Sequence, residues 1–190
     1  MNNQNPMRKI RIEKVTLNIG AGESGEKLNK AKKVLEKISN SKPVETITME
    51  RIPTWGIRPK LPIGCKITLR GKKAEEVLER LFKAMDNKIN EKKFDNTGNL
   101  SFGIPEYIDI PNVEYDPSIG IIGLEAAVTL ERPGYRIKRR RIRNKKISFK
   151  HFITKEEAKE FIKSRFNVEI VSEEVEWVIV IMKKHSSSLM

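Results

Sequence analysis

Cysteine is almost absent from this chain, which excludes the chemistry that depends on it. The 190 residues contain one cysteine, Cys65, so neither an internal disulfide nor a cysteine-based zinc site can form. Its position within PIGCKITLRG predicts a buried strand thiol. The two histidines, His151 and His185, have no carboxylate or thiol at a spacing typical of a catalytic triad or a metal cluster. We therefore expect no metal, no cofactor and no enzymatic activity.

Long apolar stretches and aromatic side chains are also scarce. Hydrophobic residues make up 38% of the chain and aromatic residues 6%. No window approaches the roughly 18 consecutive apolar residues of a membrane-spanning helix, and the opening MNNQNPMRK lacks the apolar region of a secretory signal. We therefore expect a cytoplasmic protein with no membrane partner. The apolar residues fall in periodic blocks, which predicts one domain over residues 1–190 with a flexible polar tail, 183–190.

Acidic residues are outnumbered, and one segment has none. The chain has 38 Lys and Arg against 25 Asp and Glu, a net charge of +13. Residues 132–155 hold eleven of these cations and no carboxylate. Such a segment repels itself unless an anion neutralises it, and cations that meet backbone phosphates release condensed counterions. We call residues 132–153 the basic segment and predict that it contacts nucleic-acid phosphates through Arg136, Lys138, Arg139, Arg140, Arg141, Arg143, Lys145 and Lys146.

Three aromatic rings are interleaved with these charges. Tyr135, Phe149 and Phe152 are spaced so that they could lie on unstacked bases. The alternative interpretation is a solvated basic loop with no dedicated partner.

Alternating apolar residues predict the strands. The inward residues would be Val15, Leu17 and Ile19 in 9–19, Ile47 and Met49 in 44–52, and Cys65, Ile67 and Leu69 in 65–71; residues 124–130 and 175–182 predict two further strands. With three prolines and two glycines, residues 53–64 predict an exposed loop, and residues 113–123 predict an irregular, mobile one.

Helical spacing marks three further segments. The apolar positions are Leu28, Ala31, Val34, Leu35 and Ile38 within 24–40, and Ala74, Val77, Leu78, Leu81, Phe82 and Met85 after Gly71. A third helix begins with a capping box between Thr154 and Glu157 and would bury Ala158, Phe161 and Ile162. Together these elements predict an α+β fold, with helices packed on one face of an antiparallel sheet.

The other face of that sheet would be polar. It would present Thr16, Asn18, Thr46, Thr48, Lys66, Thr68 and Arg70. Hydroxyls, an amide and cations suit the phosphates and ribose 2′-hydroxyls of an A-form helix, and the absence of rings is unlike a base-stacking sheet. Structured RNA is the partner this face favours, with DNA second; an ordinary solvated sheet face is the alternative.

A glycine motif points to a different function. Gly20, Gly22 and Gly25 spell G-x-G-x-x-G between a strand and a helix, with Glu45 about 20 residues on, as in dinucleotide-binding folds. Glu45, however, begins the second strand rather than ending it, and the later elements do not alternate as a parallel sheet requires. We interpret the glycines as a tight strand-to-helix turn.

Five segments carry a resemblance to a known family. KVTLNIGAG, KPVETITMERIP, PIGCKITLRG, FDNTGNLSFGIPEYIDIP and VEYDPSIGIIGLE, in this order, resemble universal large-subunit ribosomal protein five, the 5S rRNA-binding family, over residues 10–166. The resemblance implies one α+β domain that attaches 5S rRNA in the central protuberance of the large subunit. It also implies contacts with large-subunit rRNA, with P-site tRNA, with small-subunit ribosomal protein thirteen and with other 5S-associated ribosomal proteins.

The resemblance also assigns positions. It places Asn18, Thr46, Thr68 and Arg70 on 5S rRNA, and Lys66 lies on the same predicted face. The loop that would reach tRNA is Gly56, Ile57, Arg58, Pro59 and Lys60. The loop that would face the small subunit lies in 116–123 and contributes Asp116, Ser118, Ile119 and Gly120.

The chain departs from the bacterial pattern of this family. A glycine of the bacterial tRNA loop is missing where this chain reads PKL at 59–61, and the bacterial N-terminal helical extension is absent. The run RPGYRIKRRRIRNKK resembles an insertion of the archaeal and eukaryotic branch, for which we predict contacts with rRNA phosphates or unpaired bases.

Overall fold

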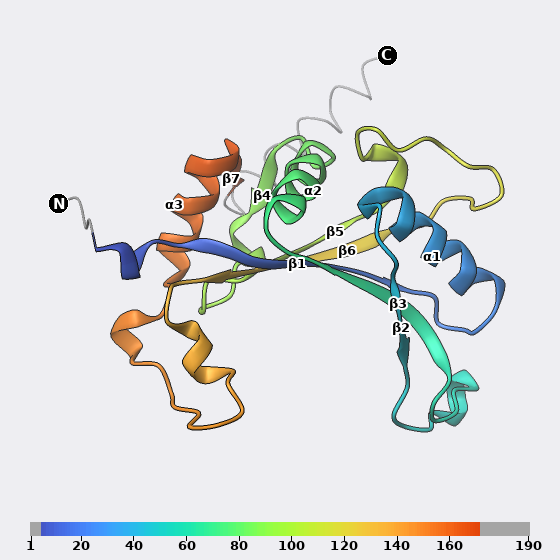
Figure 1. Cartoon of the computed structure of the whole chain (residues 1–190). Helices are drawn as coiled ribbons and strands as arrows, with labels where there is room; N and C mark the ends of the chain where they lie inside the picture. The colour runs from blue at the N-terminus through green and yellow to red at the C-terminus, as the bar shows by residue number, and fades with distance from the viewer. Residues whose placement is uncertain (1–4, 172–190) are drawn as a thin grey trace, which may run out of the picture.

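A five-stranded antiparallel sheet forms the centre of the computed structural model, which describes residues 5–171 (Figure 1). Its strands are β1 (Arg11–Gly20), β2 (Val44–Ile47), β3 (Pro62–Leu69), β5 (Leu100–Ile104) and β6 (Leu124–Glu131), in the order β2-β3-β1-β6-β5. A separate parallel pair joins β4 (Lys88–Asn90) to β7 (Glu169–Val171). Every neighbouring pair in the large sheet is antiparallel, which confirms the expected α+β class.

Three α-helices accompany the sheet within residues 5–171. They are α1 (Glu26–Ser39), α2 (Lys72–Lys83) and α3 (Lys155–Phe166). Figure 1 shows α1 and α2 on the same side of the sheet, with α3 beside β7 at one end. The capping box is present: the Glu157 backbone N–H donates to Thr154 Oγ1 (3.4 Å) and the Thr154 N–H donates to Glu157 Oε2 (3.1 Å). These bonds satisfy two N–H groups that the helix itself leaves unpaired.

The core lies between the helices and one sheet face, where the periodicity predicted it. Alternate residues of β1 and β3 are buried there, including the thiol of Cys65. Burial raises the pKa of this thiol to about 11, so it stays protonated at neutral pH. The predicted apolar stripes of α1 and α2 meet these strands, with Met85 partly buried just beyond α2, and Phe161 of α3 is also only partly buried.

The prediction for the second strand was wrong in detail. Ile47 and Met49 were expected to point into the core, but both are exposed, Met49 to 83%. The strand is only four residues long and lies at the sheet edge, so Met49 falls beyond its end. Thr48 is also outside the strand, and its hydroxyl donates to the Arg58 carbonyl (2.6 Å) within the following loop.

The antiparallel sheet excludes the dinucleotide-binding fold, which requires a parallel one. Glu45 faces the helical layer and forms an ion pair with Lys32 of α1. Gly22 and Gly25 have positive φ angles of 72° and 128°, as expected for a tight turn from β1 into α1.

Two terminal predictions fall outside the described residues: the strand over 175–182 and the tail over 183–190. Among residues 5–171, no helix is long and apolar enough to cross a membrane.

Candidate nucleic-acid interface

The predicted polar residues share one uncovered face of the sheet. Thr16 of β1 pairs with Thr68 of β3, and Asn18 pairs with Lys66. Residues that pair directly across antiparallel strands point to the same side, so all four lie opposite α1 and α2. Thr46 of β2 lies on this side as well, because it pairs with Gly64 of β3. A side chain at position 64 would come within 2.7 Å of the Thr46 hydroxyl, so glycine keeps this edge flat.

The open face continues over two strands that the sequence did not assign to it. Ala127 and Glu125 of β6 pair with Thr16 and Asn18. Ser101 and Gly103 of β5 extend the same rows, and a shallow depression crosses this region of the sheet. Strand alternation identified which residues share a side of each strand. It could not say which strands become neighbours, because the order β1-β6-β5 is set by tertiary pairing.

The basic segment is exposed along most of its length. Its side chains from Arg136 to Lys146 are exposed, and it contains short 3-10 turns at Tyr135–Lys138 and Phe149–His151. In Figure 1 it extends from the sheet on the side opposite α1 and α2, as does the loop between β2 and β3. These two projections therefore border the open face at opposite ends.

One of the three predicted stacking rings is buried. Tyr135 is only 4% exposed, and its hydroxyl donates to the His151 carbonyl (3.1 Å) while accepting from the Ile153 N–H (3.2 Å). The prediction that its ring stacks on a base was therefore wrong. The Tyr135 hydroxyl instead links the start of the basic segment to its end by hydrogen bonds. Phe152 is half-buried, whereas Phe149 is 91% exposed.

Two buried carboxylates hold one cation of the basic segment. Arg139 forms ion pairs with Glu13 and Glu131, whose side chains are 7% and 9% exposed. Arg11 also binds Glu131 (2.7 Å), and Arg70 approaches Glu13 at 3.4 Å. Glu13 is the unpaired residue of a β-bulge, because the pairing of β1 with β6 shifts between Ile12 and Lys14. Its side chain turns toward the basic segment. Two predicted RNA contacts, Arg139 and Arg70, therefore already have carboxylate partners within the protein.

Arg139→Ala is expected to loosen the basic segment without unfolding the sheet. Both carboxylates keep another arginine, so the folded core loses about 1 kcal/mol or less, whereas the segment loses its link to the sheet. Hydrogen exchange should accelerate about tenfold in the backbone of residues 136–146. Arg141→Ala removes an exposed neighbour that has no ion pair within residues 5–171 and should leave exchange unchanged; equal exchange in the two variants would contradict the role of this link.

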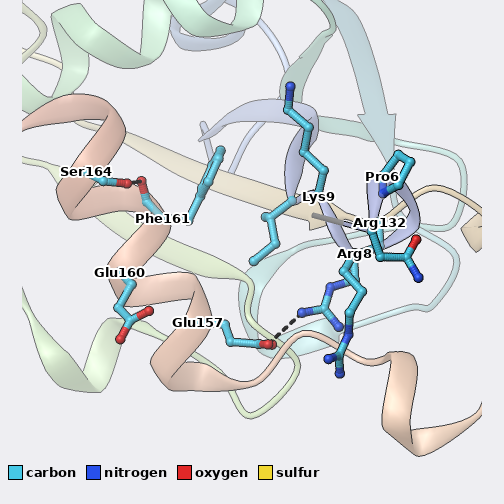
Figure 2. Close-up of a pocket in the computed structure, with 10 residues that line it drawn as sticks. Pro6, Arg8, Lys9, Arg132, Glu157, Glu160, Phe161 and Ser164 are labelled. Atoms are coloured by element: carbon cyan, nitrogen blue, oxygen red, sulfur yellow. Dashed lines mark hydrogen bonds and ion pairs between the residues drawn. The ribbon is translucent and has the colours of Figure 1, made fainter. Parts of the chain in front are cut away.

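A second arginine of the segment, Arg132, is buried beside a cleft between the N-terminal residues and α3. Figure 2 shows the Arg132 guanidinium pointing at Glu157, to which it donates a hydrogen bond of 2.7 Å. It also donates to the carbonyls of His151 (3.4 Å) and Phe152 (3.1 Å). Burial alone would raise the pKa of Glu157, but hydrogen bonds from Thr154 and Arg132 hold this pKa below its usual 4.5. Arg132 is thus a structural residue. The sequence did not indicate this role, because Arg132 belongs to a run of similar basic residues.

The loop between β2 and β3 is ordered by its own contacts. The backbones of Ile52 and Ile57 pair across it, and the Lys60 N–H donates to the Thr48 carbonyl (2.8 Å). Ile57, one of the five residues predicted to contact tRNA, is 5% exposed, so its side chain packs inside the loop. Gly56, Arg58, Pro59 and Lys60 form the exposed tip. Trp55 beside them is also exposed, although no pattern in the sequence distinguished it.

The loop over 113–123 has no regular structure but is anchored to α1 and the core. Asp116 forms an ion pair with Lys37 (2.7 Å), and its N–H donates to the Tyr107 hydroxyl (3.1 Å). The Lys37 contact and two hydrogen bonds from Ser118 hold the pKa of Asp116 well below its usual range. Ile119 is buried in the core. The segment predicted to be mobile is thus held at Asp116 and Ile119, while Ser118 and Ile121 remain exposed.

Fold and surface together define a class of protein. Residues 5–171 contain no cluster of His, Cys, Asp and Glu that could hold a metal ion. The candidate functional surface is an open polar sheet face bordered by a row of exposed cations. A polar sheet face beside a row of cations is typical of proteins that bind RNA.

Comparison with known proteins identifies the family. Residues 5–58 match the family model described as ribosomal protein L5, and residues 62–161 match the model of the C-terminal part of the same ribosomal family. Large ribosomal subunit protein uL5 of Nanoarchaeum equitans is 54% identical over 169 residues, which cover 88% of this chain and 99% of the relative. Its counterparts in Sulfurisphaera tokodaii and Methanococcus maripaludis are 52% and 48% identical, cover 88% of this chain and are themselves covered to 95% and 94%. The chain belongs to the ribosomal protein L5 family.

Membership of this family establishes the general function of the protein. The protein is a structural, non-enzymatic component of the large ribosomal subunit, associated with cytoplasmic ribosomes, and ribosomal RNA is its partner.

Proposed function

We propose that the open sheet face binds 5S rRNA and thereby attaches it in the central protuberance of the large subunit. The observation that carries this proposal is the alignment of Asn18, Thr46, Lys66 and Thr68 on one uncovered face. A surface of hydroxyls, an amide and an ammonium suits the 2′-hydroxyls and phosphates of an A-form groove. The resemblance of the surrounding segments to the 5S rRNA-binding family supports the same partner. Arg70 would join these contacts from the end of β3, beside Glu13.

The two projections would reach other ribosomal partners. The tip formed by Gly56, Arg58, Pro59 and Lys60 would contact P-site tRNA, with Ile57 supporting it from inside. Because backbone hydrogen bonds already order this loop, its two cations lose little conformational entropy when they meet a phosphate backbone. The basic segment would contact large-subunit rRNA through its exposed cations.

The anchored loop over 113–123 would form the bridge to the small subunit. Asp116 and Ile119 fix it to α1 and the core, so that Ser118 and Gly120 are presented at a defined position. By family resemblance, the partner is small-subunit ribosomal protein thirteen, and other 5S-associated proteins would lie beside the bound RNA.

Binding of 5S rRNA and of an unrelated structured RNA across a salt series tests the sheet assignment. The double variant Lys66→Ala/Thr68→Ala removes a cation and a hydroxyl, both from exposed positions. We expect about a tenfold loss of affinity for 5S rRNA and a salt slope lower by about 1, because one phosphate contact disappears. The affinity for the unrelated RNA should fall only by the electrostatic contribution of the lost lysine.

Lys33→Ala is the matched control, because it removes one exposed lysine from α1 on the opposite side of the sheet. It should leave the preference for 5S rRNA intact. A double variant that keeps its 5S preference would show that another surface reads this RNA. Wild-type protein that loses both RNAs together as salt rises would be a generic polyanion binder.

A further inference from the structure

An acidic side chain lies on the face proposed to bind RNA, near the start of β6. Glu125 of β6 is exposed and pairs with Asn18 of β1 across the sheet. It lines a depression formed by β1, β5 and β6, which Lys92 and Lys93 also border. A carboxylate here repels the phosphates that Lys66, two strands away on the same face, attracts. Its position therefore calls for a ligand group other than a phosphate.

Glu125 differs from the other carboxylates near this face. Glu13 and Glu131 lie at its far end, nearly buried, and arginines neutralise both. Glu125 forms no ion pair within residues 5–171. The Asn18 side-chain amide donates to its Oε2 (3.2 Å), which orients the carboxylate but leaves most of its acceptor capacity open.

We propose that Glu125 recognises an unpaired guanine of the bound RNA, an inference that rests on the proposed RNA-binding role of the sheet face. An ionised carboxylate only accepts hydrogen bonds, and its two oxygens present parallel acceptors. Among the four RNA bases, only guanine offers two adjacent donors on one edge, N1–H and the 2-amino group. Both belong to the Watson–Crick edge, so the guanine must be unpaired when Glu125 binds it.

The surface beside Glu125 has room for a base. Gly103 of β5 pairs directly with Glu125, and a side-chain carbon at position 103 would meet nothing closer than the Leu124 carbonyl at 3.9 Å. The neighbouring pair, Ser101 and Ala127, is also small. A flat base can therefore lie against the sheet at this point, with its donor edge toward the carboxylate.

Short RNA hairpins that differ only in one bulged nucleotide test this inference directly. Guanine, inosine, adenine and cytosine are compared at the bulge. Wild-type protein should bind the guanine hairpin at least fivefold more tightly than the adenine hairpin, since a bidentate pair discriminates by about 1–3 kcal/mol. Inosine, which keeps N1–H but lacks the 2-amino group, should fall between them.

Glu125→Gln separates recognition from simple repulsion. The amide cannot accept both guanine donors, so the guanine preference should disappear, while the adenine hairpin should bind more tightly because a negative charge is gone. Gly103→Val should also abolish the preference by filling the space, without changing any charge. Glu36→Gln, an exposed substitution on α1, is the matched control and should change nothing.

Two results would overturn the inference. One is a wild-type protein that binds all four hairpins alike; the other is a Glu125→Gln variant that strengthens all four by the same factor, as expected of a carboxylate that only repels RNA. Neither result depends on the comparison of 5S rRNA with an unrelated RNA. A protein that prefers 5S rRNA without preferring guanine would retain the proposed function and lose only this inference.

Discussion

Removing four exposed cations from the basic segment is expected to lower the affinity for rRNA by about two orders of magnitude near physiological salt. The four are Arg136, Arg141, Lys145 and Lys146, none of which has an ion pair within the described part of the chain. Each phosphate contact contributes about 0.7–0.9 to the salt slope, so the slope should fall by about 3. Filter binding or anisotropy with large-subunit rRNA fragments, at several salt concentrations, measures both quantities.

A charge-matched variant separates a local contact from net charge. Alanine at Lys33, Lys72, Lys73 and Lys83 removes four cations from α1 and α2 instead. It should weaken binding by a few-fold at most, through the smaller overall field of the protein. If the two variants lose the same affinity and slope, RNA binding depends on total charge and the basic segment has no dedicated role.

Arg132→Ala is expected to destabilise the fold by about 3 kcal/mol. The substitution removes a side chain that is 3% exposed, breaks its ion pair with Glu157 and leaves the carbonyls of His151 and Phe152 without this donor. For a protein of this size, such a loss corresponds to a melting temperature lower by roughly 6–12 °C. Thermal and chemical unfolding followed by circular dichroism would measure it.

Arg136→Ala supplies the contrast, because it removes the same charge from an exposed position four residues further along. Its melting temperature should stay within about 2 °C of wild type, since surface substitutions rarely exceed about 0.5 kcal/mol. When both proteins are folded, Arg136→Ala should weaken RNA binding more than Arg132→Ala does. If Arg132→Ala were as stable as Arg136→Ala, the buried guanidinium would make no net contribution to the free energy of unfolding.

The elements of the fold follow from local patterns in the sequence. Val15, Leu17 and Ile19 alternate at the period of a strand, and Leu28 and Leu35 recur at the period of a helix; both sets are buried as expected. Periodicity succeeds here because each element is covered on one side by a long apolar partner surface. It failed at Ile47 and Met49 because β2 is a short edge strand, where apolar residues can remain exposed.

The candidate RNA surface was predictable in composition but not in extent. Thr16, Asn18, Lys66 and Thr68 were assigned to one side from alternation alone, and strand register places them together. Glu125 and Gly103 were missed because they belong to strands about 80 or more residues from β1, which only tertiary pairing brings beside Asn18. Nothing in a single sequence specifies that order of strands.

By itself the sequence determined the secondary structure of the core, the excess of positive charge and the side of β1 and β3 that carries polar groups, since these depend on residue type and short-range spacing. Only the tertiary structure decided which charges and rings are free to meet RNA. Arg132 and Tyr135 are buried, Arg139 is paired with Glu13 and Glu131, and Phe149 remains exposed, although all four belong to one run of similar composition. The physical reason is that carboxylates and carbonyls from other parts of the chain form ion pairs and hydrogen bonds with some of these groups. The composition of the basic segment does not show which distant residues will lie beside it.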